Sequence, residues 1–300
     1  MPNYKKEFRK IARRLTLADL QFGFEDEKIT MESILDDSGR IKADTRLFLG
    51  LFTEKGIKRV LDEFGITKVL ERKGLKNLRI CIDTSDPFLN KLFIYFDGKK
   101  DCDHCICELV VKKDVTIPSR VLPIKLENNT LNFLHIEWLL LQDPTKSFSP
   151  AKPALPGQRF PGLGLGDMLM ELLILLGKRL SFDGISNKPA HFYTAYMFTR
   201  VFYFVNSKHQ ALIEAAKRQL LPKYTFFQLA WAFYYGCVIN KKTYEIINWE
   251  PDWLILPLSK VVLKYFNSQQ YKSKVKEHIK NFQLEIDMNK LSDKLKEKSS

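Results

Sequence analysis

The spacing of apolar residues predicts helices near the start of the chain. In residues 4–20, Phe8, Ile11 and Leu15 recur among basic residues with the period of an amphipathic helix. A second helical pattern covers residues 46–73, and we expect Gly56 and Gly65 to interrupt it. Residues 1–74 are therefore predicted to form a helical segment packed on the rest of the protein.

The pattern changes to that of strands after this segment. Residues 78–83, 92–96 and 104–111 are rich in β-branched and aromatic side chains and are separated by short polar turns. Connections this short join antiparallel strands. Residues 131–141 are nearly all apolar, which predicts a central strand buried on both faces.

A long loop and an apolar helix follow this central strand. Residues 142–161 contain prolines at 144, 150, 153, 156 and 161, and residues 162–166 are a glycine cluster. The apolar run at 168–176 predicts a buried helix that begins directly after the glycines. A short strand at 182–186, a helix from Pro189 and an aromatic strand at 200–205 complete a predicted core over residues 75–206.

The remaining third is predicted to be mainly helical. Residues 207–268 form an aromatic helical extension, and residues 269–300 form a charged helix or tail rich in lysine and glutamate. The aromatic side chains from Phe226 to Tyr235 indicate core packing, a hydrophobic pocket or the face of a homodimer.

The composition indicates a folded protein with an excess of positive charge. The chain has 300 residues, 45% of them hydrophobic, and a formal net charge of +13. This excess suits a nucleic acid, an anionic membrane surface or a phosphorylated cofactor. The basic residues from Lys5 to Arg14 could contact RNA or acidic lipid, but the favoured interpretation is a solvated helix face.

The cysteines and the apolar runs indicate a cytoplasmic protein. The five cysteines are odd in number and unevenly spaced, which does not match a disulfide framework. No apolar signal core follows the basic start, and no apolar run is long enough to span a bilayer. Cys102, Cys105 and Cys107 lack the second ligand pair of a zinc site, so we expect no metal.

The glycine cluster is the strongest candidate for chemistry. Glycines let a ligand approach the backbone, and the first amides of a helix point outward where the helix dipole favours an anion. We expect the amides of Leu163, Gly164, Leu165 and Gly166 to surround a pyrophosphate, with Arg159 adding charge-assisted hydrogen bonds. The alternative is a loop that only reverses the chain.

The order of these elements and two motifs resemble the GCN5-related N-acetyltransferase (GNAT) superfamily. The stretch from Arg159 to Gly164 fits the acyl-CoA loop of that family, Arg/Gln-x-x-Gly-x-Gly/Ala. The stretch from Asn187 to Ala190 fits its Asn-x-x-Ala motif, and Tyr193 follows. The family's usual Gly-Phe is replaced here, and the resemblance covers roughly residues 75–206.

The resemblance implies a fold, a cofactor and a reaction. The fold is a mixed, mostly antiparallel sheet flanked by helices, and the cofactor is acetyl-CoA or another acyl-CoA, bound by the glycine loop, Arg159 and Asn187. The reaction is direct transfer of the acyl group to the amine of a small molecule or a protein. Glu137 is the candidate base, His135 lies on the same strand face, and Tyr193 is the candidate proton donor. An ionised Glu137 in so apolar a strand should be strained.

Other interpretations stay open. A dinucleotide-binding glycine motif would need a third glycine where Asp167 stands. A protein with this fold could bind CoA, another phosphate ligand or a partner without catalysis. A basic protein associated with RNA or a membrane is the least favoured alternative.

Overall fold

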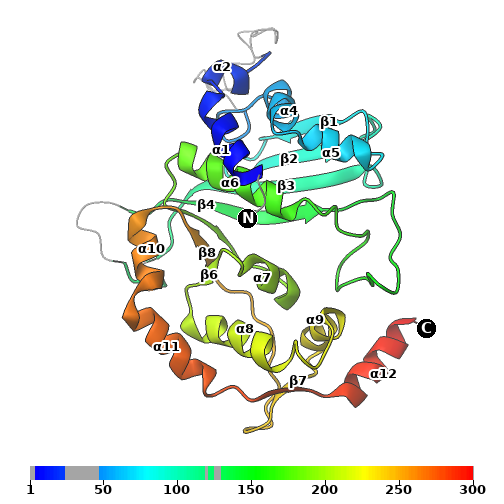
Figure 1. The fold of residues 1–300 in the computed structure, drawn as a ribbon, viewed down its shortest axis with the longest axis vertical. Helices are drawn as coiled ribbons and strands as arrows, with labels where there is room; N and C mark the ends of the chain where they lie inside the picture. The colour runs from blue at the N-terminus through cyan, green and yellow to red at the C-terminus, as the bar shows by residue number, and fades with distance from the viewer. Residues whose placement is uncertain (1–3, 24–46, 119–120, 125–129, 300) are drawn as a thin grey trace. The chain divides into compact units, whose positions relative to one another are not determined.

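The computed structural model describes residues 4–23, 47–118, 121–124 and 130–299 (Figure 1). Among these residues, the strands are β1 (Arg79–Asp83), β2 (Asn90–Tyr95), β3 (Cys105–Val115), β4 (Phe133–Leu141), β5 (Gly184–Asn187), β6 (Tyr203–Phe204), β7 (Val238–Asn240), β8 (Leu254–Pro257) and β9 (Leu284–Ile286). The helices are α1 (Tyr4–Arg14), α2 (Leu17–Leu20), α4 (Glu54–Glu63), α5 (Ile66–Arg72), α6 (Gly166–Arg179), α7 (Phe192–Phe198), α8 (Ser207–Gln219), α9 (Phe226–Tyr234), α10 (Lys260–Asn267), α11 (Gln269–Ile279) and α12 (Met288–Ser299).

The architecture is a mixed α+β fold, as the sequence predicts. A seven-stranded, mostly antiparallel sheet has the strand order β1-β2-β3-β4-β5-β8-β6, and helices flank it. A separate two-stranded sheet pairs β7 with β9. No helix among the described residues has both the length and the apolar composition needed to cross a membrane.

The chain folds into two compact units. Unit 1 consists of Met1–Lys113, His135–Ser147 and Gly162–Leu180, and unit 2 consists of Asp114–Leu134, Phe148–Pro161 and Ser181–Ser300.

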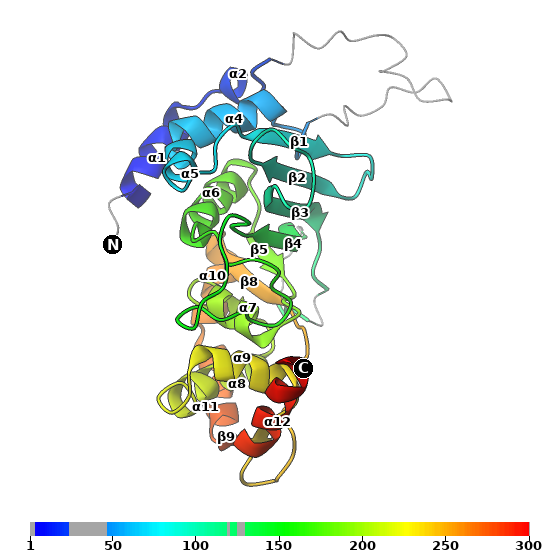
Figure 2. The ribbon, with the colours of Figure 1, turned by 90° about the vertical axis from the view of Figure 1, so that its right-hand side faces the viewer.

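Unit 1 is a layer of helices on the antiparallel strands β1 to β4. Figure 2 shows α1, α4, α5 and α6 on one side of these strands. Ile80 pairs with Ile94, and Leu92 pairs with Leu109, so apolar side chains share one face of neighbouring strands. The edge-to-face contact of the Phe8 and Phe64 rings, with centroids 4.8 Å apart, packs α1 onto the residue that ends α4.

Unit 2 is built around three short strands and a group of aromatic side chains. β8 lies between β5 and β6, with Ile185 opposite Leu256 and Tyr203 opposite Ile255. The rings of Phe192 on α7 and Phe233 on α9 stack with their centroids 3.7 Å apart. This stacking supports the interpretation of the aromatic region as core.

The region after residue 207 is mainly helical and also contains the short strands β7, β8 and β9. Two local expectations from the sequence are wrong. Gly56 does not interrupt the helical pattern but lies buried inside α4. The central strand β4 is buried only along its first four residues, and its second half is exposed or half-buried.

Gly56 gives a stability prediction. A Cβ on this residue would lie 1.8 Å from the carbonyl oxygen of Leu20, so Gly56→Ala must push α2 away from α4. Overpacking of this kind costs about 1–3 kcal/mol. We expect the melting temperature of the affected transition, measured by circular dichroism, to fall by about 4–8 °C. Lys58→Ala, at an exposed position of the same helix, is the control and should change it little. Equal melting temperatures for both variants would contradict the close packing.

Candidate functional site

Main-chain hydrogen bonds hold the glycine cluster at the end of β4. The amide of Gln142 donates to the carbonyl of Ile106 at 3.1 Å, which fixes the end of β4 onto β3. The Gln142 side-chain amide donates to the carbonyl of Cys105 at 2.9 Å. The amide of Leu163 then donates to the carbonyl of Leu141 at 3.3 Å. The start of α6 is thereby held at the end of β4, within unit 1.

The amides that follow Leu163 are the candidate anion site. The amide of Leu163 is already bonded to Leu141, and its side chain is buried. Leu163 is therefore not one of the amides that could bind a pyrophosphate. Within the described ranges, the amides of Gly164, Leu165 and Gly166 donate to no protein acceptor. Leu165 is the residue that caps α6, and its side chain cannot accept a hydrogen bond. Three main-chain donors therefore stay available at the positive end of a 14-residue helix.

Lys73 is a basic residue near this loop that the sequence did not indicate. It follows α5, and its Nζ would lie 3.9 Å from a Cβ placed on Gly164. Gly164 has a φ of +76°, a conformation that favours glycine. Lys73 forms no ion pair with a described residue. Because more than 90 residues separate Lys73 from α6 along the chain, no local motif could have linked them.

Glu137 and His135 share one face of β4, as predicted. The distance from the Nε2 of His135 to the nearer carboxylate oxygen of Glu137 is 3.7 Å. The expectation of a strained carboxylate buried in an apolar strand is wrong, because the Glu137 side chain is 44% exposed. Its carboxylate pairs with the Nζ of Lys112 on β3 at 2.7 Å. Lys112 therefore balances the charge of Glu137, whose carboxylate is also accessible to solvent.

The exposed half of β4 also carries a large apolar side chain. Trp138 is 53% exposed, and its indole N–H donates to a carboxylate oxygen of Glu108 at 3.1 Å. The following leucines, Leu139 to Leu141, are half-buried. An apolar strand end that its own unit leaves partly open is suited to contact with a ligand or another surface.

Two predicted cofactor residues, Arg159 and Asn187, belong to unit 2. The guanidinium carbon of Arg159 lies 5.1 Å from the ring centre of the neighbouring Phe160. Asn187, the last residue of β5, is only 5% exposed, and its Oδ1 accepts no hydrogen bond from the described residues. A buried carbonyl without a donor is costly, commonly about 1–3 kcal/mol, unless a ligand supplies one.

Tyr193 has a clear structural role in unit 2. Its hydroxyl donates to the carbonyl of Pro156 at 2.9 Å, and burial raises the pKa of this hydroxyl. The indole N–H of Trp231 donates to the carbonyl of Ala154 at 3.0 Å. These two donors hold the proline-rich loop within unit 2, so a proton transfer from Tyr193 would require its hydroxyl to leave Pro156.

The cysteine-rich strand lacks the features of a metal site. Among the described residues, no group of three or more His, Cys, Asp or Glu side chains could hold a metal ion. Burial raises the pKa of Cys105 to about 11 and that of Cys107 to about 12. A metal ligand must be a thiolate, which these pKa values oppose.

No protein-family model matches this chain, and comparison with curated proteins finds no significant match.

The burial of four cysteines gives a reactivity prediction. Only Cys102 is exposed, and at pH 8 a thiol with a pKa near 11 is ionised in about one molecule in a thousand. Ellman's reagent should therefore titrate one thiol rapidly in the native protein and five after denaturation. The variant Cys102→Ser should lose the rapid phase and nothing else. Two or more rapid equivalents in the native protein would refute the buried assignment.

Proposed function

We propose that the protein is an acyl-CoA-dependent N-acyltransferase that transfers an acetyl group from acetyl-CoA to an amine in a ternary complex. The observation that carries the proposal is the set of available amides at Gly164, Leu165 and Gly166, held at the exposed end of β4. Phosphate groups bind well to such amides at a helix start. Lys73 supplies a positive charge near the same loop.

The order of elements supports the same family resemblance. Antiparallel strands, a central strand, the glycine loop, a helix, a strand, a second helix and a third strand follow one another as β1 to β4, α6, β5, α7 and β6. Within unit 2, the Asn-x-x-Ala motif contains Asn187, whose buried Oδ1 accepts no hydrogen bond from the described residues.

The chemistry asks little of the protein beyond orientation and proton transfer. The amine nitrogen attacks the thioester carbonyl, a C–N bond forms, and the C–S bond breaks. The amine loses a proton, and the departing thiolate gains one. Glu137 is the proposed proton acceptor, directly or through water, because its carboxylate is accessible and lies beside His135. Lys112 would have to share this carboxylate with the incoming amine.

Cofactor binding is predicted to depend on the glycine loop. Gly164→Ala forces a side chain into a conformation with φ of +76° at the proposed phosphate site, and it should weaken acetyl-CoA binding at least tenfold in isothermal titration. Gly98→Ala introduces similar strain, with φ of +68° and open space around the new Cβ, in the turn between β2 and β3, outside the glycine loop. This control should bind acetyl-CoA normally.

Lys73 provides a second variant in the same titration. Lys73→Met should weaken binding several-fold and reduce its dependence on salt, whereas Lys68→Met on the exposed side of α5 should have no effect. The proposal fails if the native protein produces no heat with acetyl-CoA.

Turnover is predicted to depend on Glu137. Glu137→Gln keeps the size of the side chain and removes its basicity, so kcat with a reactive amine should fall by about 10²–10⁴. Acetyl-CoA binding should not change. Loss of thioester absorbance across a panel of amines measures the rate without interference from the protein's own thiols. Glu108→Gln on β3 is the control, because it also removes a carboxylate from this sheet. An unchanged rate in Glu137→Gln would exclude this residue as the base.

A second function, binding of CoA or another phosphate ligand without turnover, is favoured by the contacts of Tyr193 and Glu137. The hydroxyl of Tyr193 is engaged by Pro156, and the carboxylate of Glu137 is engaged by Lys112. Acetyl-CoA binding with no thioester loss across the amine panel would select this alternative.

A further inference from the structure

Helix α1 carries six basic residues, and two of them pair with a buried acidic side chain. Its apolar side chains Phe8 and Ile11 are buried. Lys5 and Arg9 flank the buried carboxylate of Glu171 on α6, at 3.4 and 3.5 Å. These two cations balance a charge that would otherwise be buried alone, so their presence has a structural reason.

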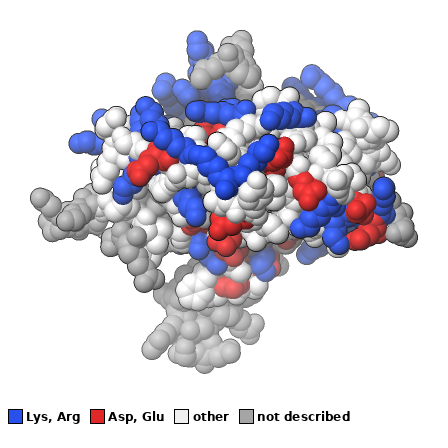
Figure 3. All heavy atoms as spheres, turned by 90° about the horizontal axis from the view of Figure 1, so that it is seen from below, with Lys and Arg blue, Asp and Glu red and all other residues white. Residues whose placement is uncertain are grey.

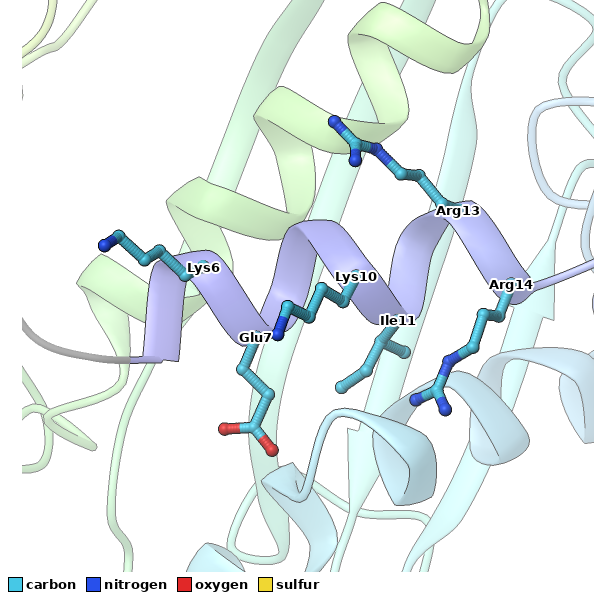
Figure 4. A pocket seen from close by; sticks show the side chains of 6 residues that line it. All are labelled: Lys6, Glu7, Lys10, Ile11, Arg13 and Arg14. Carbon is cyan, nitrogen blue, oxygen red and sulfur yellow. The ribbon is translucent and has the colours of Figure 1, made fainter.

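The other four cations of α1 have no such reason. Lys6, Lys10, Arg13 and Arg14 are exposed and pair with no acidic side chain of the described chain. At 3.6 residues per turn, they fall within about 100° of arc, and we call them the basic stripe. Figure 4 shows the stripe along α1, with Arg13 and Arg14 extending to opposite sides of the helix and Lys10 between them.

The basic stripe borders a hollow in the surface. The hollow has a volume of about 750 Å³, and the four stripe residues line it together with Glu7 and Ile11. Among the described residues that line it, Glu7 is the single acidic one, and Ile11 is 6% exposed. The described part of this lining is therefore mainly cationic.

Some basic residues of α12 are compensated. On α12, Lys294 pairs with Glu297 at 2.9 Å, and Lys296 lies 3.7 Å from Asp293. Figure 3 shows a face of the molecule on which acidic groups lie among the basic ones. On the stripe, like charges four residues apart repel one another, and a bound polyanion would remove this repulsion.

We propose that the basic stripe of α1 binds the phosphate backbone of a nucleic acid strand, independently of its sequence. An interfacial membrane helix needs its apolar face for the lipid, but the apolar face of α1 is buried against the protein. Phosphodiester binding needs only positive charges along a track, which Lys6, Lys10, Arg13 and Arg14 provide over about 12 Å of helix. The stripe has no exposed aromatic residue for base stacking, so affinity depends on salt and not on base identity.

Fluorescence anisotropy with a labelled single-stranded oligouridine RNA tests this proposal on the full chain. The native protein should bind at about 50 mM salt, with log K falling as log salt rises. The variant Lys10→Gln, Arg13→Gln, Arg14→Gln should bind more than tenfold more weakly, and its salt slope should be shallower by about 2, at about 0.7 for each lost phosphate contact.

The matched control is Lys272→Gln, Lys274→Gln, Lys276→Gln, at exposed positions of α11. It removes the same net charge and should keep both affinity and slope. The proposal is overturned if the native protein does not bind, if both variants lose affinity equally, or if the native protein binds phosphatidylserine vesicles but not RNA. Circular dichroism verifies that the variants are folded. The outcome is independent of the proposed enzyme, because acetyl-CoA binding should be the same in all three proteins.

Discussion

The hydrogen bond from the amide of Leu163 to the carbonyl of Leu141 is the contact on which the candidate site depends. It closes a loop of about 20 residues, which costs about 3 kcal/mol in chain entropy before any contact within the loop is counted. Without it, the glycines would not stand at the end of β4, and the amides of Gly164, Leu165 and Gly166 would face no defined surface. The hydrogen bond from the Gln142 side-chain amide to the carbonyl of Cys105 holds the start of the loop on β3.

The entropy cost of this long loop is partly offset by hydrogen bonds made by residues in its middle. The carbonyls of Ala154 and Pro156 accept hydrogen bonds from Trp231 and Tyr193, both within unit 2. Main-chain carbonyls of a proline-rich segment have few neighbouring N–H groups, so donors must come from side chains. This explains why a tyrosine that resembles a catalytic residue in sequence is also a structural residue in the fold.

The local elements could be predicted from sequence, and the non-local ones could not. β1 to β4 and α6 are each marked by their own periodicity and by flanking turns, and the structure confirms them. β8 has only the four residues Leu254–Pro257, and its place between β5 and β6 comes from pairing with strands about 50 to 70 residues earlier. A short apolar run alone cannot distinguish such a strand from part of a buried helix. The same limit explains Gly56, whose contact with Leu20 no pattern within α4 reveals.

The candidate site also has one part that local sequence predicts and another that depends on the fold. The position of the glycine loop at a helix start follows from neighbouring residues, but the surroundings of Glu137 follow from which half of β4 other elements cover. An apolar sequence indicates burial, yet it carries no information on where the covering layer ends. Charge behaves similarly. The net charge of +13 does not identify a partner, since many lysines and arginines pair with acidic side chains. Lys294 and Lys296 on α12 pair with acidic residues three positions away, whereas the basic stripe pairs with no acidic side chain of the described residues. A cation therefore becomes informative about ligands when the described residues give it no acidic partner, as on the outer face of α1.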